Sequence, residues 1–182
     1  FLLLAPPFDD KKYYGYISLY PKGVRENGGQ YTHGAIWFIL ALIRCGRADE
    51  AYEIFKAINP VEKCKDETTV RKYMAEPYVL AADVSSCENL GRAGWTWYTG
   101  SASWCFKTML EGFLGVSVKD GNIVIDPAPP KALSTYDVIY DDKKSKYIFL
   151  RRRTNIRSSK TVWIWARSTH SRLSPTKTES FS

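Results

Sequence analysis

The chain has 182 residues and a formal net charge of +7, with 26 Lys and Arg against 19 Asp and Glu, and 45% of its residues are hydrophobic. The excess charge lies at one end: residues 1–150 hold 18 basic and 18 acidic residues, whereas residues 151–182 hold eight basic residues and one acidic residue, Glu179. Binding to a phosphate backbone requires a basic surface on the folded domain, so this distribution argues against a nucleic-acid partner. The hydrophobic content is enough for the core of one domain and excludes intrinsic disorder of residues 1–150.

Neither a membrane span nor a metal site is expected. The longest apolar run, residues 35–43, is far shorter than the roughly 20 residues that a membrane span needs. The sequence starts at Phe1, and FLLLAPP lacks the charged segment of a secretory signal, so we interpret it as a truncated chain and expect a cytoplasmic location. The four cysteines form no CxxC pair and the two histidines no ligand cluster, which predicts reduced thiols and no metal.

The first two predicted elements are helices. Residues 35–44 are apolar on every side and Gly46 follows them, which predicts a helix buried among other helices. Residues 49–58 carry apolar side chains at helical spacing, with acids in the first turn, and are expected to form an amphipathic outer helix. Together they predict an αα-hairpin, the unit of helical bundles and double-layered helical barrels.

The middle of the chain gives a mixed pattern. Residues 60–73 are charged and predicted to be irregular, whereas residues 78–84 are apolar and predicted to form a second short inner helix. Residues 87–99 mix Gly with aromatic residues, a composition typical of loops that face ligands. Helical periodicity resumes over residues 101–114.

The pattern then changes to strands. Short apolar runs at 116–118 and 123–125 flank an Asp-Gly turn, which predicts a hairpin, and further strands are expected at 136–140 and 147–150. The tail, residues 151–182, is rich in Ser, Thr and Arg and has no periodicity except in TVWIW. Two interpretations stay open for the tail: a disordered basic extension, or translation out of frame.

A polar segment lies directly before the buried helix. In residues 23–33, GVRENGGQYTH, hydrogen-bonding side chains surround two glycines, and burying such groups is costly unless they are paired or face a cavity. A helix N-terminus also favours an anion, and His33 adds a donor or a positive charge. The alternatives are a core or capping role for His33 and a plain surface ion pair between Arg25 and Glu26.

A second candidate segment follows the Gly-rich loop. Trp95, Trp97 and Tyr98 are consistent either with core packing or with stacking on the apolar face of a sugar. Residues 99–101, Thr-Gly-Ser, come at the start of a helix and predict another anion nest.

Six segments carry a resemblance to a known family. They are YPKGVRENGGQYTHGAIW (20–37), AYEIFKAINP (51–60), EPYVLAADV (76–84), GRAGWTWYTGSASW (91–104), LEGFLGV (110–116) and IDPAPP (125–130). In order and spacing they resemble the C-terminal half of glycoside hydrolase family 94, the inverting disaccharide and oligosaccharide phosphorylases together with the phosphorylase domain of cyclic β-1,2-glucan synthase. The resemblance covers about residues 12 to 150, and GGQYTH and GWTWYTGSA are closer to the β-1,2-glucan-acting members than to chitobiose phosphorylases.

The resemblance implies a fold and a site. The fold is mainly α: the C-terminal part of an (α/α)6 barrel over residues 1–114, then short β-strands of a C-terminal β domain over residues 115–150, and the basic tail. The phosphate-binding residues would be His33, Thr99 and Gly100. The sugar-binding residues would be Glu26, Arg25, Gln30, Tyr31 and Trp97.

The implied reaction is phosphorolysis of a β-linked gluco-oligosaccharide with inversion, which gives α-glucose 1-phosphate. Phosphate is then the co-substrate and nucleophile, no cofactor is needed, and one carboxylic acid protonates the leaving oxygen. That acid is an aspartate in an upstream motif that these 182 residues lack, and neither Asp83 nor Glu76 takes its role. We therefore expect the chain to supply the phosphate half of a site, to be inactive alone, and to come from a homodimeric parent.

Two departures and three alternatives accompany this interpretation. IDPAPPKALSTY differs from the usual family sequence, and no match is found beyond Leu150. One alternative is the phosphorylase domain of a cyclic β-1,2-glucan synthase, with a membrane-bound parent. Others are a non-catalytic carbohydrate-binding module that uses Trp95 and Trp97, and nucleic-acid binding by the tail.

Overall fold

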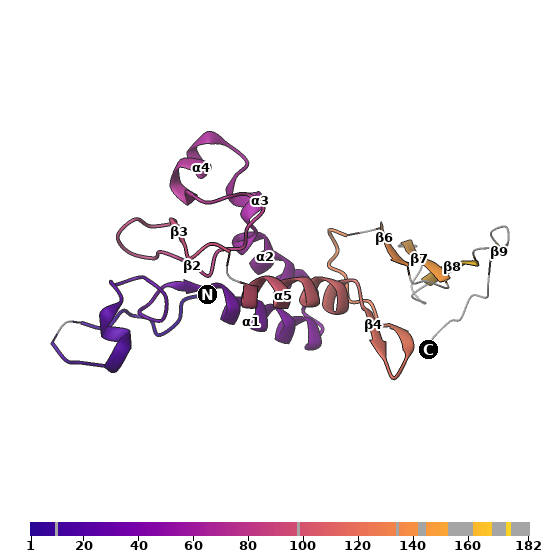
Figure 1. Ribbon diagram of the computed structural model, residues 1–182, viewed down its shortest axis with the longest axis horizontal. Coiled ribbons are helices and arrows are strands. Elements are labelled where there is room, and N and C mark those ends of the chain that lie inside the picture. Colours follow the sequence, from indigo (N-terminus) through magenta and orange to yellow (C-terminus); the bar gives the residue numbers. More distant parts are fainter. Residues whose placement is uncertain are drawn as a thin grey trace.

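The structure is a computed structural model that describes residues 1–9, 11–97, 99–133, 135–141, 145–152, 162–168 and 174–175. It combines helices with three small antiparallel sheets (Figure 1). The helices are η1 (Gly15–Leu19), α1 (Thr32–Arg44), α2 (Ala48–Ile58), α3 (Pro60–Lys63), α4 (Glu67–Tyr73), α5 (Thr99–Lys107) and the π-helix η2 (Thr108–Phe113). The strands are β1 (Gln30–Tyr31), β2 (Asp83–Val84), β3 (Ala93–Gly94), β4 (Val116–Lys119), β5 (Asn122–Ile125), β6 (Thr135–Asp141), β7 (Ser145–Arg152), β8 (Val162–Ser168) and β9 (Ser174–Pro175).

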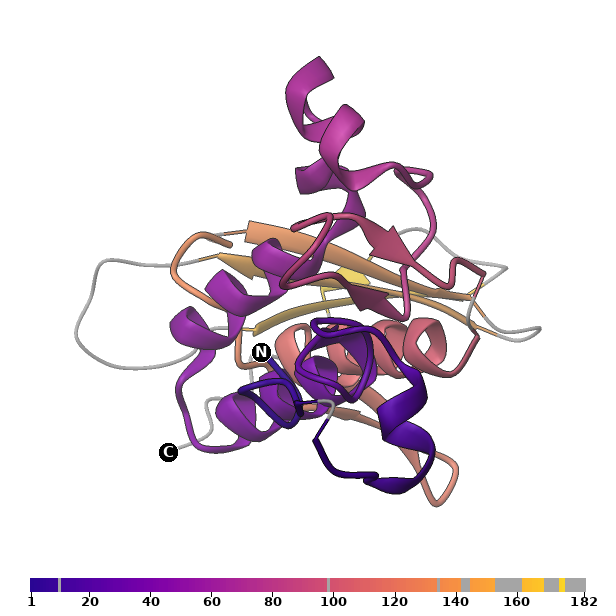
Figure 2. The ribbon, with the colours of Figure 1, turned by 90° about the vertical axis from the view of Figure 1, so that its left-hand side faces the viewer.

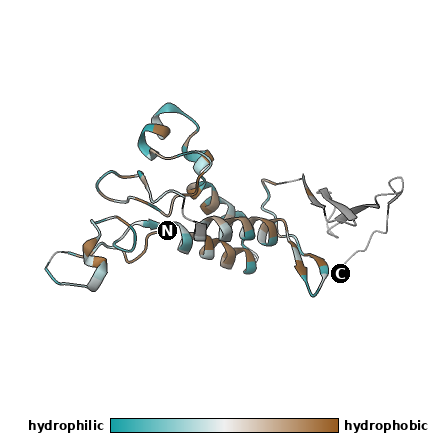
Figure 3. Cartoon of the chain, in the orientation of Figure 1, coloured by the Kyte–Doolittle hydropathy of each residue, from teal (hydrophilic) through white to brown (hydrophobic). Residues whose placement is uncertain are grey.

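The core lies between α1, α2 and α5, which run side by side in Figures 1 and 2, and η2, which directly follows α5 in the chain. Hydrophobic residues recur along α1 in Figure 3. The helices bury one cluster of apolar side chains, of which Phe113, Ile36 and Ile39 are the largest that are fully buried. The cluster comprises Ala35, Ile36, Ile39, Leu42, Ile43, Ala51, Ile58 and Phe113. At roughly 1.5–3 kcal/mol for each large apolar side chain, this burial is what holds the helices together.

The αα-hairpin is confirmed. α1 and α2 pack against each other and are joined at Gly46, whose φ of +74° suits glycine at a helix end. α2 is amphipathic, as expected, and buries Ala51 and Ile58. The prediction that α1 is buried all round was wrong: Trp37 is 53% exposed and Phe38 42% exposed, because α2, α5 and η2 cover only one side of α1.

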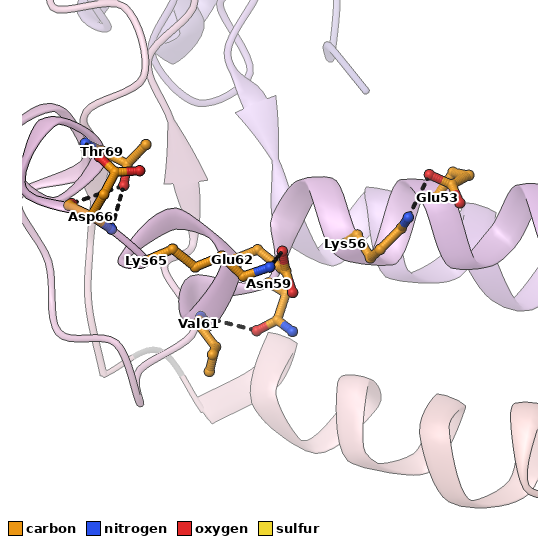
Figure 4. Close-up of polar contacts among 8 residues, drawn as sticks. All are labelled: Glu53, Lys56, Asn59, Val61, Glu62, Lys65, Asp66 and Thr69. Carbon is orange, nitrogen blue, oxygen red and sulfur yellow. Dashed lines mark hydrogen bonds and ion pairs between the residues drawn. The ribbon is translucent and has the colours of Figure 1, made fainter. Parts of the chain in front are cut away.

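The prediction of irregular structure over residues 60–73 was also wrong, because local capping forms two short helices there (Figure 4). The Asn59 side chain accepts a hydrogen bond from the Val61 amide, and Pro60 occupies the first helical position of α3. α4 begins with a capping box in which Asp66 Oδ1 accepts from the Thr69 amide at 2.9 Å.

Residues 78–84 do not form the predicted helix. They form turns and then β2, which pairs with β1 on one side and with β3 on the other. Val79, Ala81 and Ala82 are buried nonetheless, so the apolar pattern reports burial correctly but not the backbone conformation.

The predicted hairpin near residue 120 is confirmed. β4 and β5 pair in antiparallel register through a tight turn in which Asp120 and Gly121 have φ of +50° and +76°. The strands expected at 136–140 and 147–150 are confirmed as β6 and β7. Val138 packs with Val116, so β6 contacts the end of the helical part.

Within the tail, β8 pairs with β7 and β9 pairs with β8, whereas residues 153–161, 169–173 and 176–182 lie outside the described residues. The origin of the tail stays a prediction. No helix in the described part of the chain is long and apolar enough to cross a membrane, and those same residues contain no cluster of three or more metal-ligating side chains. All four cysteines are free thiols, and burial raises the pKa of Cys105.

Candidate functional site

The β1–β2–β3 sheet joins the two segments that carry the candidate residues. Its middle strand, β2, places Asp83 opposite Tyr31 of β1 and opposite Gly94 of β3. β1 leads directly into α1, and four residues separate β3 from the start of α5. The sheet therefore lies at the end where both helices begin (Figure 1).

A dense set of backbone hydrogen bonds shapes the loop that precedes β1. The Gly23 amide donates to the Asn27 carbonyl at 2.7 Å, and the Asn27 amide donates to the Val24 carbonyl at 3.0 Å. The buried Asn27 side chain also connects the loop to residues that precede it: it accepts a hydrogen bond from the Phe8 amide and donates one to the Tyr20 carbonyl. The loop is therefore a fixed scaffold for Arg25 and Glu26.

His33 and Gly100 lie next to each other. A Cβ atom on Gly100 would stand 3.8 Å from both Cε1 and Nδ1 of the His33 ring. His33 is in the first turn of α1 and Gly100 in the first turn of α5, so two helix N-termini, each the positive end of a helix dipole, meet beside the imidazole. The ring is held edge-on against Trp37 at 4.7 Å between centroids.

Arg25 and Glu26 form a second cluster beside this end of the sheet. The Arg25 guanidinium lies 4.4 Å from the centroid of the Trp95 ring and within 6 Å of the Tyr20 and Tyr31 rings. Its Nε is 3.5 Å from Glu26 Oε2, and both side chains are largely buried, at 8% and 17% exposed. The alternative of a plain surface ion pair is wrong, because this pair is enclosed by aromatic rings.

The remaining predicted residues divide between the cluster and the surface. Gln30 and Tyr31 form β1, and the Tyr31 ring contacts Arg25. Trp97 lies apart from these contacts: it is 67% exposed, and its Nε1 donates to Glu76 Oε1 at 3.3 Å. Tyr98 and the side chain of Thr99 lie outside the described residues, although the Thr99 backbone starts α5.

Buried polar atoms without a hydrogen-bond partner gather in this region. Among the described residues they include Gln30 Nε2, His33 Nε2 and Asp83 Oδ1. Buried polar groups are nearly always hydrogen-bonded in folded proteins, so these atoms give the region an unused capacity to bind a polar ligand. The arrangement offers an anion-binding corner at His33 and Gly100, and hydrogen-bonding groups for a polar ligand at Arg25 and Glu26.

Asp83 has an unusual environment for a carboxyl group. It is 2% exposed, and burial raises its pKa, although the Arg25 amide and guanidinium oppose that rise. Its Oδ2 accepts a hydrogen bond from the Arg25 amide at 2.8 Å. Sequence reasoning missed this contact, because no local pattern reports a contact across 58 residues.

The sequence matches one family over most of its length. Residues 1–115 match the family described as "Glycosyl hydrolase 94 superfamily, catalytic domain". Members of this family are glycoside phosphorylases and related glycosyltransferases. The chain itself belongs to glycoside hydrolase family 94.

Three relatives give the range of similarity. The chain is 45% identical over 136 residues to the cyclic beta-(1,2)-glucan synthase NdvB of Rhizobium meliloti, covering 74% of the chain and 5% of that protein. It is 28% identical over 145 residues to an N,N'-diacetylchitobiose phosphorylase of Vibrio furnissii, covering 79% of the chain and 17% of the relative. It is 28% identical over 133 residues to a solabiose phosphorylase of Paenibacillus borealis, covering 71% and 17%.

These comparisons confirm the family resemblance inferred from the six segments. The higher identity to the glucan synthase than to the chitobiose phosphorylase agrees with the likeness seen in GGQYTH and GWTWYTGSA. The chain spans only 5% to 17% of the length of these relatives.

Proposed function

We propose that this chain supplies the phosphate-binding half of the site in an inverting glycoside phosphorylase that cleaves β-linked gluco-oligosaccharides. The observation that carries the proposal is the proximity of His33 to Gly100 at two adjacent helix N-termini, where a Cβ atom on Gly100 would stand 3.8 Å from the imidazole. A phosphate ion placed there would accept hydrogen bonds from helix amides and from the imidazole, whose buried Nε2 has no hydrogen-bond partner among the residues that the structure describes. Thr99 would add its backbone amide at the start of α5.

The sugar would lie on the Arg25 and Glu26 side of the site. The Glu26 carboxylate is held by Arg25 and suits acceptance of hydrogen bonds from sugar hydroxyls. Gln30 and Tyr31 would line the same side, and Trp97 would contact an outer part of the oligosaccharide.

The chemistry follows from these positions. Phosphate attacks the anomeric carbon on the face opposite the departing sugar, so the configuration inverts and α-glucose 1-phosphate forms. The protein must hold the anion and donate one proton to the leaving oxygen. We propose that a carboxylic acid outside these 182 residues donates that proton, and that the helices of this chain form part of an (α/α)6 barrel.

Phosphate is a co-substrate in this scheme, which needs no cofactor. A cytoplasmic location and a homodimeric parent stay predictions.

Calorimetric titration of the 182-residue chain with inorganic phosphate tests the anion site. We expect binding that His33→Ala abolishes and that His170→Ala, which removes the only other histidine, leaves intact. No binding by the unchanged chain, or equal binding by the His33→Ala variant, would overturn the proposal. Formation of glucose 1-phosphate by the chain alone would overturn the placement of the acid elsewhere.

Two alternatives have specific support. The 45% identity to NdvB favours a cyclic β-1,2-glucan synthase as the parent. The exposed pair of Trp97 and Tyr78, with ring centroids 6.1 Å apart, favours a non-catalytic carbohydrate-binding module. Such a module has no reason to bind phosphate, so the same titration separates it from a phosphorylase.

A further inference from the structure

The Asp83 carboxylate connects the middle strand of the β1–β2–β3 sheet to the loop that carries Glu26. Its Oδ2 accepts a hydrogen bond from the Arg25 amide at 2.8 Å, across 58 residues of sequence. A carboxylate that accepts from a backbone amide in a buried setting makes a strong, charge-assisted hydrogen bond. This bond fixes the backbone directly before Glu26.

The backbone at Arg25 needs such a support. Its φ is +50°, in the left-handed region that side chains other than Gly, Asn and Asp rarely adopt. The Gly29 amide donates to the Arg25 carbonyl at 2.9 Å, so Arg25 is held at both its amide and its carbonyl. The left-handed conformation of Arg25 sets the direction in which the side chain of the next residue, Glu26, extends from the backbone.

The other carboxylate oxygen is fixed by close packing. A Cβ atom on Gly94 would stand 2.6 Å from Asp83 Oδ1, nearer than any real Cβ contact, so the carboxylate occupies space that only a glycine leaves open. The backbone at Gly94 is not in the left-handed region, so its conformation does not require a glycine. A glycine is required there because any side chain would collide with the Asp83 carboxylate.

We propose that Asp83 is a positioning residue for sugar binding: through the Arg25 amide it sets the orientation of the Glu26 carboxylate. The proposal rests on the proposed function, in which Glu26 lies on the sugar side and His33 on the phosphate side. It predicts that loss of the Asp83 contact weakens oligosaccharide binding and leaves phosphate binding unchanged, whereas a purely structural role would weaken both.

Two variants displace the carboxylate by different routes. Asp83→Ala removes it, and Gly94→Ala pushes a methyl group against Oδ1 while Asp83 stays in place. Asp83→Asn keeps an oxygen that accepts from the Arg25 amide and serves as the rescue variant. Asp120→Asn, in the β4–β5 turn, removes a carboxylate elsewhere and tolerates the positive φ of that position.

The experiment titrates each folded variant of the 182-residue chain with a β-1,2-linked gluco-oligosaccharide and, separately, with inorganic phosphate. Asp83→Ala and Gly94→Ala are expected to raise the oligosaccharide dissociation constant about tenfold, and Asp83→Asn and Asp120→Asn less than about threefold. All four variants should keep the dissociation constant of phosphate. Amide hydrogen exchange should also become faster at Arg25 in Gly94→Ala, a readout that applies even where Asp83→Ala fails to fold.

The outcomes separate the two proposals. No binding of either ligand by the unchanged chain overturns the proposed function and this inference with it. Normal binding by the unchanged chain and by the Gly94→Ala and Asp83→Ala variants overturns the role of Asp83 alone. Equal loss of both affinities in those variants shows that Asp83 is merely structural and overturns the inference as well.

Discussion

Gly100 lies against the imidazole of His33, 67 residues away in sequence, at a distance where an added Cβ would stand 3.8 Å from Nδ1. This distance is ordinary van der Waals contact, so a methyl group fits there but occupies the space in which the phosphate is proposed to bind. The two residues thus link the packing of α1 on α5 directly to the candidate anion site.

Enlarging Gly100 should therefore block phosphate without unfolding the chain. We expect Gly100→Val to lower the affinity for inorganic phosphate at least tenfold, about 1.4 kcal/mol, while the free energy of unfolding changes by less than about 1 kcal/mol. Ala102→Val creates the same side chain by adding two methyl groups at an exposed position of the same helix turn, and it should keep the affinity. Calorimetry measures the affinities, and full phosphate binding by Gly100→Val would contradict the placement of the anion.

Gly23 should be the least replaceable glycine of the loop before β1. Its φ is +84°, and a Cβ atom there would lie 2.5 Å from the Cys87 backbone nitrogen. We expect Gly23→Ala to lower the free energy of unfolding by roughly 3 kcal/mol, of which about 1–2 kcal/mol comes from the left-handed backbone alone. Gly121→Ala, with φ of +76° and open space, should show only that smaller part. Equal losses in urea denaturation would show that the Cys87 contact can relax.

Local patterns predicted the parts of the fold that local interactions determine. The α1–α2 hairpin follows from helical periodicity and Gly46, and the β4–β5 hairpin follows from an Asp-Gly turn between short apolar runs. The helix predicted for residues 78–84 was wrong, because β2 forms by pairing with β1, about 50 positions away, and with β3, about 10 positions away.

The candidate site divides in the same way. His33 and Gly100 were each predicted from a polar segment at a helix start, and the structure brings them together. No sequence pattern predicts the contact of Asp83 with Arg25, because an aspartate within an apolar segment does not indicate which distant residue it will bind. The aromatic enclosure of Arg25 was hidden for the same reason, since Trp95 is distant in sequence.

The capping box of α4 should contribute measurably to stability. Asp66 Oδ1 accepts a hydrogen bond from the Thr69 amide, and Thr69 Oγ1 accepts one from the Asp66 amide at 3.3 Å. We expect Asp66→Ala to lower the free energy of unfolding by about 1 kcal/mol. Glu67→Ala removes only the exposed ion pair with Arg71 and should cost less than about 0.5 kcal/mol. Chemical denaturation of both variants checks this, and a larger effect at Glu67 would contradict it.

Tyr73 should make the chain sensitive to alkali. Tyr73 is 3% exposed, and burial raises the pKa of its phenol to about 12. Cys64 adds to this rise in pKa, and a hydrogen bond with the Ala81 backbone opposes it. The folded chain therefore holds this proton more tightly than the unfolded chain does. The resulting stability is fully present below about pH 10 and is lost as the pH rises from about 10 to 12, by about 2 kcal/mol at most.

Tyr73→Phe should remove that pH-dependent loss, because the variant has no phenol to ionise. Tyr78→Phe is the matched control, since the Tyr78 side chain is 75% exposed and its replacement should leave the alkaline profile unchanged. Urea denaturation at pH 8.5 and pH 11.5 gives the free energies of unfolding for the three chains. The quantity that decides is the drop between the two pH values: it should be smaller in Tyr73→Phe than in the unchanged chain and in Tyr78→Phe. Equal drops in all three would mean that the Tyr73 phenol reaches water more readily than its burial implies.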